Sequence, residues 1–171
     1  MQHLQKLQKN VEHRLNTIHS AFSLPLDEIH LMTLPPRHCH RLFEGYKHEE
    51  EMDFLMKQLI NLNQNRLYII GSNQMGTMIS LPSLLKKKTL SYQSVFLIDE
   101  EGADLIDGGD YLCVTYRGNY EQSAYWGQQL AQYAHAHKFK IRGDLLEILW
   151  IDIHTTSDES EYITQLQLPI A

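Results

Sequence analysis

The sequence predicts an α+β domain made of two related halves and preceded by an N-terminal helix. Three observations support this class. Strand-like and helix-like hydrophobic patterns alternate along the chain, the order strand, helix, strand, strand occurs twice, and a similar segment (Phe43–Tyr46 and Tyr116–Tyr120) precedes the long helix of each half. The 171 residues, 43% of them hydrophobic, are enough for one domain with a core and a short appended helix.

The first segment, residues 2–22, is expected to form one amphipathic helix. Its apolar residues recur at steps of three or four and are Leu4, Leu7, Val11, Leu15, Ile18 and Phe22. So narrow a stripe can pack on its own domain or pair with a second copy of the helix, and we favour pairing. Pro25 ends the segment, because the residue before a proline is pushed out of the helical region. We therefore expect a linker or dimerisation helix at 1–24 and the main domain at 25–171.

The first half of the domain is expected to contain one long helix between extended segments. Pro35 and Pro36 interrupt the first extended run, which indicates an edge or a bulge there. The acidic residues Glu49, Glu50 and Glu51 suit the first turn of the helix. The predicted elements are an extended run at 28–43, a helix at 45–63, a strand at 67–70, a loop at 72–91 with a short helix at 81–87, and a strand at 92–98.

The second half repeats this order. Asn119, with Gln122 three residues later, is the pattern of a helix cap. The predicted elements are a strand at 110–116, a helix at 120–137, a strand at 145–153, a turn at 158–160 and a strand at 162–170.

Glu147 is the candidate recognition group, because it is the charge in the middle of a strand that is apolar on both faces. Alternate residues of a strand share a face, so in the predicted strand at 145–153 one face carries Leu145, Glu147, Leu149, Ile151 and Ile153, and the other carries Leu146, Ile148 and Trp150. Burying an unpaired carboxylate is costly or raises its pKa. Glu147 should therefore have a distant partner, be protonated, lie at a wet sheet edge, or face a cavity that awaits a cation. Arg142, at odd spacing, is expected on the opposite face.

Tyrosines near the ends of the predicted elements could surround this carboxylate. Aromatic faces attract a cation by roughly 0.5 to 2 kcal/mol each, and their flat apolar area also holds aromatic ligands. A carboxylate among aromatic rings therefore suits bulky lipophilic cations. The candidates are Tyr46, Tyr68, Tyr120, Tyr125 and Tyr162.

Three segments, Gly109–Glu121, Glu147–Asp152 and Glu161–Ile170, resemble the GyrI-like domain in their order and spacing. That domain is the C-terminal effector-binding domain of MerR-type multidrug-responsive transcription regulators, and it also occurs alone. The resemblance covers about residues 26–171. It implies two pseudo-symmetric β-α-β-β units that form one curved antiparallel sheet, with helices packed on one side and a ligand groove between the units.

The resemblance also implies a function. Glu147 matches the cation-sensing acid, and the groove aromatics fall near Tyr68, Tyr120, Tyr125 and Tyr162, with Tyr46 as the first-half counterpart of Tyr120. Residues 2–22 resemble the dimerisation helix that joins the sensor to a DNA-binding domain. No helix-turn-helix precedes this helix here, so the expected protein is either part of a regulator or a stand-alone relative. It would bind lipophilic, cationic or aromatic small molecules without catalysis, and form homodimers through its N-terminal helix.

Composition excludes several other classes of function. The net charge of −6 and the pI near 5.9 provide no positive field for nucleic acid, and Lys86-Lys87-Lys88 is too short a run to change that. We therefore expect contact with DNA only through a separate domain. No signal peptide or membrane-length apolar span is found, so we expect a cytoplasmic chain with no membrane partner and no cofactor. Cys39 and Cys113 are expected to be small buried residues, and the alternative that they form one disulfide is left open by the sequence.

Three competing functions stay open. A metal site would use residues 38–40 and 135–137. However, two histidines that are two residues apart on a helix do not share a face and cannot bind one metal ion together, so we expect no metal. A stand-alone hydrolase would use Glu147 as acid or base, although no Gly-x-Ser-x-Gly or catalytic cysteine pattern accompanies it. A protein-binding module is supported by analogy of fold alone.

Overall fold

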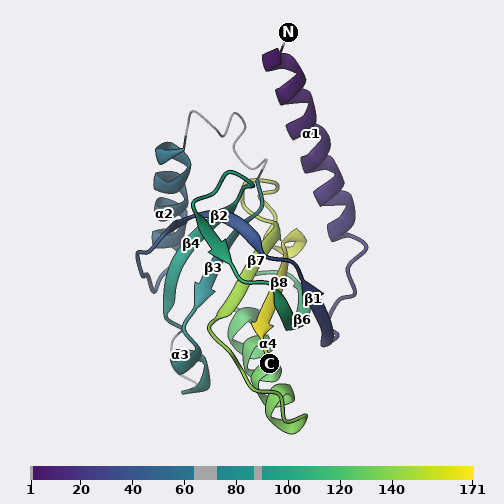
Figure 1. Ribbon diagram of the computed structural model, residues 1–171, viewed down its shortest axis with the longest axis vertical. Helices are drawn as coiled ribbons and strands as arrows, with labels where there is room; N and C mark the ends of the chain where they lie inside the picture. The colour runs from purple at the N-terminus through teal and green to yellow at the C-terminus, as the bar shows by residue number, and fades with distance from the viewer. Residues whose placement is uncertain (1, 64–72, 87–89) are drawn as a thin grey trace.

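The structure, a computed structural model, describes residues 2–63, 73–86 and 90–171. In this part of the chain eight strands form one antiparallel sheet, accompanied by four α-helices and a short 3-10 helix, η1 (Glu159–Glu161) (Figure 1). The strands are β1 (His30–Leu34), β2 (Arg37–Leu42), β3 (Met75–Ile79), β4 (Tyr92–Ile98), β5 (Asp104–Ile106), β6 (Gly109–Arg117), β7 (Leu145–Ile151) and β8 (Ile163–Pro169). The helices are α1 (Gln2–Ala21), α2 (Glu49–Leu62), α3 (Leu81–Leu85) and α4 (Gln122–Ala136).

The sheet order confirms the predicted duplication. The strands lie in the order β1-β6-β8-β7-β3-β4-β2-β5, so the unit β6-α4-β7-β8 supplies one half and the unit β2-α2-β3-β4 supplies the other. The two halves run in opposite order across the sheet and meet where β7 pairs with β3, as an internal twofold axis requires. β1 extends the sheet beside β6, and β5 extends it beside β2.

The sheet is strongly curved because of a short link between distant strands. Only Pro35 and Pro36 separate β1 from β2, yet these strands lie first and seventh in the sheet, so its two ends must approach each other. The prolines therefore join two strands, and do not interrupt one extended run as the sequence indicated. The concave side, here called the inner face, is filled by a core of Cys39, Phe96, Ile106, Tyr111, Cys113, Leu146 and Ile148.

Helices α2, α3 and α4 cover the opposite side, here called the outer face. The apolar face of α2 packs on the first half through Met52, Leu55, Met56 and Leu59. α3 and α4 cover the second half with Leu84, Leu130 and Ala134. Two separate apolar cores therefore lie under the helices, one in each half of the sheet.

The C-terminal end of α1 packs on the sheet. Ile18 and Ala21 contact Trp150, Ile151 and Ile163 near the end of β7. Figure 1 shows the rest of α1 extending away from the sheet toward the N-terminus. Leu4, Val11 and Leu15 of the predicted apolar stripe are 70%, 47% and 51% exposed, so the described part of this stripe leaves a large apolar surface open to solvent.

Some predicted elements differ from the structure. β3 lies at the heart of the sheet, in the stretch 72–91 that the sequence predicted as loop, and the predicted strand at 67–70 lies outside the described residues. β5 was not predicted. The N-cap of α4 is Glu121 and not the predicted Asn119, and the Gln122 amide donates to the Arg117 carbonyl oxygen, 2.8 Å away.

Both cysteines are buried on the inner face and neither forms a disulfide. Burial raises the pKa of the Cys113 thiol to about 12, and burial also raises the pKa of Cys39. They therefore behave as small apolar residues, as the sequence predicted. Among the described helices, none is both long and apolar enough to cross a membrane.

Candidate functional site

Glu147 lies at the centre of the outer face and is 1% exposed, so its predicted burial is confirmed. It is the third residue of β7 and lies directly opposite Thr77, the third residue of β3. Two neutral hydroxyl groups hold its carboxylate: the Thr77 hydroxyl donates to Oε2 at 2.8 Å, and the Ser123 hydroxyl donates to Oε1. The Tyr116 hydroxyl oxygen lies 2.6 Å from Ser123 Oγ and extends this buried chain. The partners of Glu147 thus include hydroxyls from the other half of the sheet and from α4.

A cavity of about 290 Å³ reaches this carboxylate from the outside. Residues from both halves line it: Tyr46, Lys47, Met52, Leu90, Tyr92, Tyr120, Glu121, Ala124 and Glu147. Most of the lining is aromatic or aliphatic, with few charged groups, which is typical of small-molecule sites. The volume lies near the lower end of the usual range for such sites, about 300 to 1,000 Å³.

Two stacked tyrosine pairs flank the cavity, one in each half. Tyr46 stacks on Tyr92 with ring centroids 4.4 Å apart and planes 9° apart. Tyr120 stacks on Tyr162 at 5.3 Å and 25°. Tyr46 and Tyr120 each precede the long helix of their half, and their partners stand at the start of β4 and just before β8. The duplication therefore supplies both aromatic walls from equivalent places in the chain.

The structure brings together only part of the predicted set. Tyr46 and Tyr120 line the cavity with Glu147, and Tyr162 supports Tyr120 from behind while remaining 96% buried, at 4% exposure. Tyr125 is 57% exposed, packs edge-on against Trp126 and is not among the lining residues. Tyr68 lies outside the described residues.

Sequence reasoning missed Tyr92, Thr77 and Ser123. Tyr92 could have been found from the duplication, since it opens β4 much as Tyr162 precedes β8. No comparable signal marks Thr77 or Ser123, because a lone hydroxyl in a strand or helix is common. Both lie too far from residue 147 in the chain for a local pattern to link them.

Opposite charges stand at the solvent side of the cavity. Lys47 and Glu121 are exposed lining residues, while Glu147 is the buried acid. Glu51 accepts hydrogen bonds from the backbone N–H groups of Lys47 and His48, at 2.9 and 3.3 Å, and these bonds lower the pKa of its carboxyl group. The same bonds fix the turn that carries Tyr46 and Lys47 into the start of α2. The site thus combines preorganised aromatic walls with one deep acid.

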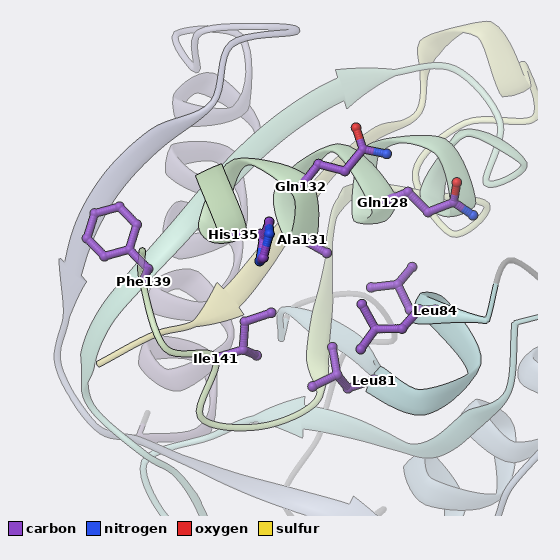
Figure 2. A pocket seen from close by; sticks show the side chains of 9 residues that line it. Leu81, Leu84, Gln128, Ala131, Gln132, His135, Phe139 and Ile141 are labelled. Atoms are coloured by element: carbon purple, nitrogen blue, oxygen red, sulfur yellow. The ribbon is translucent and has the colours of Figure 1, made fainter. Parts of the chain in front are cut away.

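A larger cavity, of about 540 Å³, lies between α3 and α4. Figure 2 shows the side chains of Leu81, Leu84 and Ile141 gathered on one side of it, while the amides of Gln128 and Gln132 extend from α4. Among the described residues that line it, His135 alone is titratable, and it is exposed. Cavity size alone therefore does not identify the candidate binding site. The buried carboxylate and the two tyrosine pairs favour the smaller cavity.

The histidine pairs do not assemble a ligand set. His40 Nε2 lies 3.0 Å from Asp99 Oδ2, and His38 Nδ1 lies 3.2 Å from the Gly102 carbonyl oxygen. Within residues 2–63, 73–86 and 90–171, no group of three or more His, Cys, Asp or Glu side chains is placed to hold a metal ion.

Known proteins resemble this chain in structure but not in sequence. No protein-family model matches the sequence, and no curated protein matches it. The cryo-EM structure of EcmrR bound to DNA is similar with a TM-score of 0.68 and 13% identity, over 99% of this chain and 68% of that chain. The crystal structure of the EcmrR C-terminal domain is similar at 0.63 and 14%, over 84% of this chain and 97% of that one. A hydrolase from Listeria innocua is similar at 0.51 and 10%, over 90% and 96% respectively.

These TM-scores establish a shared fold, but the sequence identities are too low to establish a shared function. The function therefore has to be inferred from the site. This chain thus has the fold found in the C-terminal domain of EcmrR.

Proposed function

We propose that this protein is an effector-binding domain that takes a lipophilic cation or a flat aromatic molecule into the cavity above Glu147. The observation that supports it is the buried carboxylate at the floor of a cavity walled by Tyr46, Tyr92 and Tyr120. Each aromatic face adds roughly 0.5 to 2 kcal/mol of attraction for a cation, and the carboxylate adds charge recognition in a site lined mostly by apolar groups. The similarity to the EcmrR C-terminal domain agrees with this function.

The exposed stripe of α1 supports the wider role. Leu4, Val11 and Leu15 present apolar side chains at helical spacing, and about half or more of each is exposed. We propose that α1 pairs with α1 of a second copy, so that the protein is a homodimer in the cytoplasm. Ligand binding would then regulate transcription only if a DNA-binding domain joined to this one responds to a difference in affinity between two arrangements.

The test compares two substitutions that remove the same charge from the same cavity. Glu147→Gln removes the buried acid, and Glu121→Gln, the matched control, removes the exposed one. Each protein is titrated with a panel of lipophilic aromatic cations and their neutral isosteres, by calorimetry and by thermal shift. A hundredfold excess over the Kd adds about 2.7 kcal/mol of stability. At about 2–4 °C per kcal/mol, this raises the Tm of a chain of this size by about 5–11 °C.

We expect Glu147→Gln to weaken the binding of cations at least about tenfold and to leave the neutral isosteres unaffected, since it removes a charge-assisted contact. Glu121→Gln should change either class by less than about threefold, because an exposed charge is screened. Equal losses in the two variants, or equal binding of cations and isosteres to the wild type, would contradict charge recognition by Glu147.

A hydrolase is the second candidate, because Glu147 both reaches the cavity and accepts a hydrogen bond from Ser123. In that function Glu147 would act as general acid or base toward an electrophilic ligand. Turnover of a bound ester or epoxide by the wild type, abolished in Glu147→Gln, would favour the enzyme over the sensor.

A further inference from the structure

A second cavity opens on the inner face, behind the candidate effector site. It has a volume of about 160 Å³, and its lining includes Met78 and Leu146. These two residues lie opposite each other on β3 and β7, one position beyond the Thr77–Glu147 pair. Because successive side chains of a strand point to opposite faces, the two cavities lie back to back across the same pair of strands.

Two arginines line this inner cavity, and a third lies over its Tyr111 ring. Arg41 of β2 and Arg142, from the segment before β7, line it together with Tyr111. The guanidinium carbons of Arg37 and Arg142 lie 5.9 and 5.7 Å from the centre of the Tyr111 ring. The guanidinium carbon of Arg41 lies 5.9 Å from the centre of the Phe96 ring. Aromatic faces thus hold these cations in place beside an apolar interior.

These guanidinium groups have little compensation from the protein. Arg37 Nε, Arg37 Nη2 and Arg41 Nε are buried and have no hydrogen-bond partner. Arg142 Nε donates to the Ile170 carbonyl oxygen at 2.6 Å, which leaves its terminal nitrogens for other partners. Burial lowers the pKa of the Arg37 guanidinium, which is the direction expected when a cation is desolvated.

The nearby acids do not pair with these arginines. The two ion pairs within 4.0 Å in the described part of the chain are His40–Asp99 and Lys57–Asp53. Asp107 and Asp144 also line the cavity, but Asp107 is exposed, and Asp144 Oδ1 accepts a hydrogen bond from the backbone N–H of Leu81 at 2.8 Å. Asp104 Oδ2 accepts from the backbone N–H of Arg41, not from its side chain. Buried N–H donors without an acceptor are costly, so an oxyanion from outside would stabilise them.

We propose that the inner cavity binds a small organic carboxylate, held by the guanidinium groups of Arg41 and Arg142. A guanidinium group presents a planar fork of N–H donors that matches the two oxygens of a carboxylate. The rest of the lining includes Leu105, Ile106 and Leu146, which suit an apolar body behind the charged group. The volume is close to that of a cavity that holds one benzene ring, about 150 Å³, so a ring-sized acid fits better than inorganic phosphate.

The experiment uses the full chain with benzoate as probe, benzamide as its neutral isostere and inorganic phosphate as the competing oxyanion. Binding is measured by calorimetry and by thermal shift in wild type, Arg41→Gln and Arg41→Lys. Arg117→Gln is the matched control, because Arg117 lies outside this cavity, where its side chain donates to the Ser160 carbonyl oxygen.

We expect saturable binding of benzoate that is at least about tenfold tighter than that of benzamide, because the amide lacks the charge that the guanidinium groups recognise. Arg41→Gln should weaken benzoate about tenfold or more, as expected for the loss of a charged hydrogen-bond donor. Arg41→Lys should weaken benzoate binding less, because lysine keeps the positive charge but lacks the planar fork of donors. This variant also provides the test if Arg41→Gln does not fold. Arg117→Gln should bind benzoate as the wild type does. Binding of phosphate in place of benzoate, equal binding of benzamide, or full binding by both Arg41 variants would overturn the proposal.

Discussion

Replacing Thr77 with valine tests the hydroxyl support of the buried acid. Valine keeps the shape of threonine but removes the O–H group that donates to Glu147 Oε2 at 2.8 Å. Thr77 is fully buried and Glu147 is 1% exposed, so water cannot readily replace the lost donor. A hydrogen bond to a charged group contributes about 1.5–3 kcal/mol. At about 2–4 °C per kcal/mol for a chain of this size, the Tm should fall by about 3–12 °C.

A double-mutant cycle isolates that interaction from other effects of the substitution. Urea unfolding at pH 7.5, followed by tryptophan fluorescence, is measured for the wild type, Thr77→Val, Glu147→Met and the double variant. Replacing both partners with apolar groups removes the unsatisfied acceptor, so the double variant should be more stable than the sum of the single effects by about 1.5–3 kcal/mol. Unfolding free energies that add to within about 0.5 kcal/mol would refute a direct Thr77–Glu147 hydrogen bond in solution.

Three further predictions concern packing, ionisation and assembly. Gly76→Ala should destabilise the fold by about 1–3 kcal/mol in urea unfolding, since its Cβ would meet the Phe96 ring and come within 2.7 Å of the Glu147 carbonyl oxygen; unchanged stability would contradict this packing. The folded pKa of Cys113, about 12, exceeds its ordinary value near 8.5, so Cys113 should lower the stability as pH rises from about 8.5 to 12, by at most about 1.4 kcal/mol per pH unit. Unfolding measured across that range should show a weaker dependence on pH in Cys113→Ala, with the contribution of Cys39 remaining; an unchanged dependence would contradict the burial of the Cys113 thiol. Leu15→Glu should convert a dimer to a monomer in sedimentation equilibrium; a dimer that persists would locate the interface elsewhere.

The elements with strong hydrophobic patterns were predicted well. The predicted strand at 92–98 has the bounds of β4, and the predicted helix at 45–63 contains α2. Periodicity sufficed in both cases, because each of these elements buries one continuous apolar surface. The repeated order of elements was enough to predict the duplication, which the sheet order confirms.

β3 was not predicted, because its residues are suited to their contacts with neighbouring strands and not all of them have high strand propensity. Gly76 leaves room for the Phe96 ring from the neighbouring strand, and Thr77 supplies a donor to Glu147. A five-residue segment that contains a glycine and a polar residue resembles a loop when the neighbouring strands are unknown. The same dependence on distant partners hid Ser123, whose hydroxyl matters only because α4 places it over β7. The orientation of Tyr125 was likewise not evident from the sequence, since a position near the end of a helix does not determine which way the side chain points.

The direct opposition of Thr77 and Glu147 shows how a duplicated chain departs from its own symmetry. Side chains directly opposite each other in antiparallel strands have Cβ atoms roughly 4.5–5.5 Å apart. Acids at both positions would repel each other, and one of them would keep a proton at neutral pH. With threonine in one copy and glutamate in the other, the repeated architecture builds a pair of matching walls around a floor that carries a single formal charge. A guest of charge +1 can then be neutralised without a second acid left uncompensated.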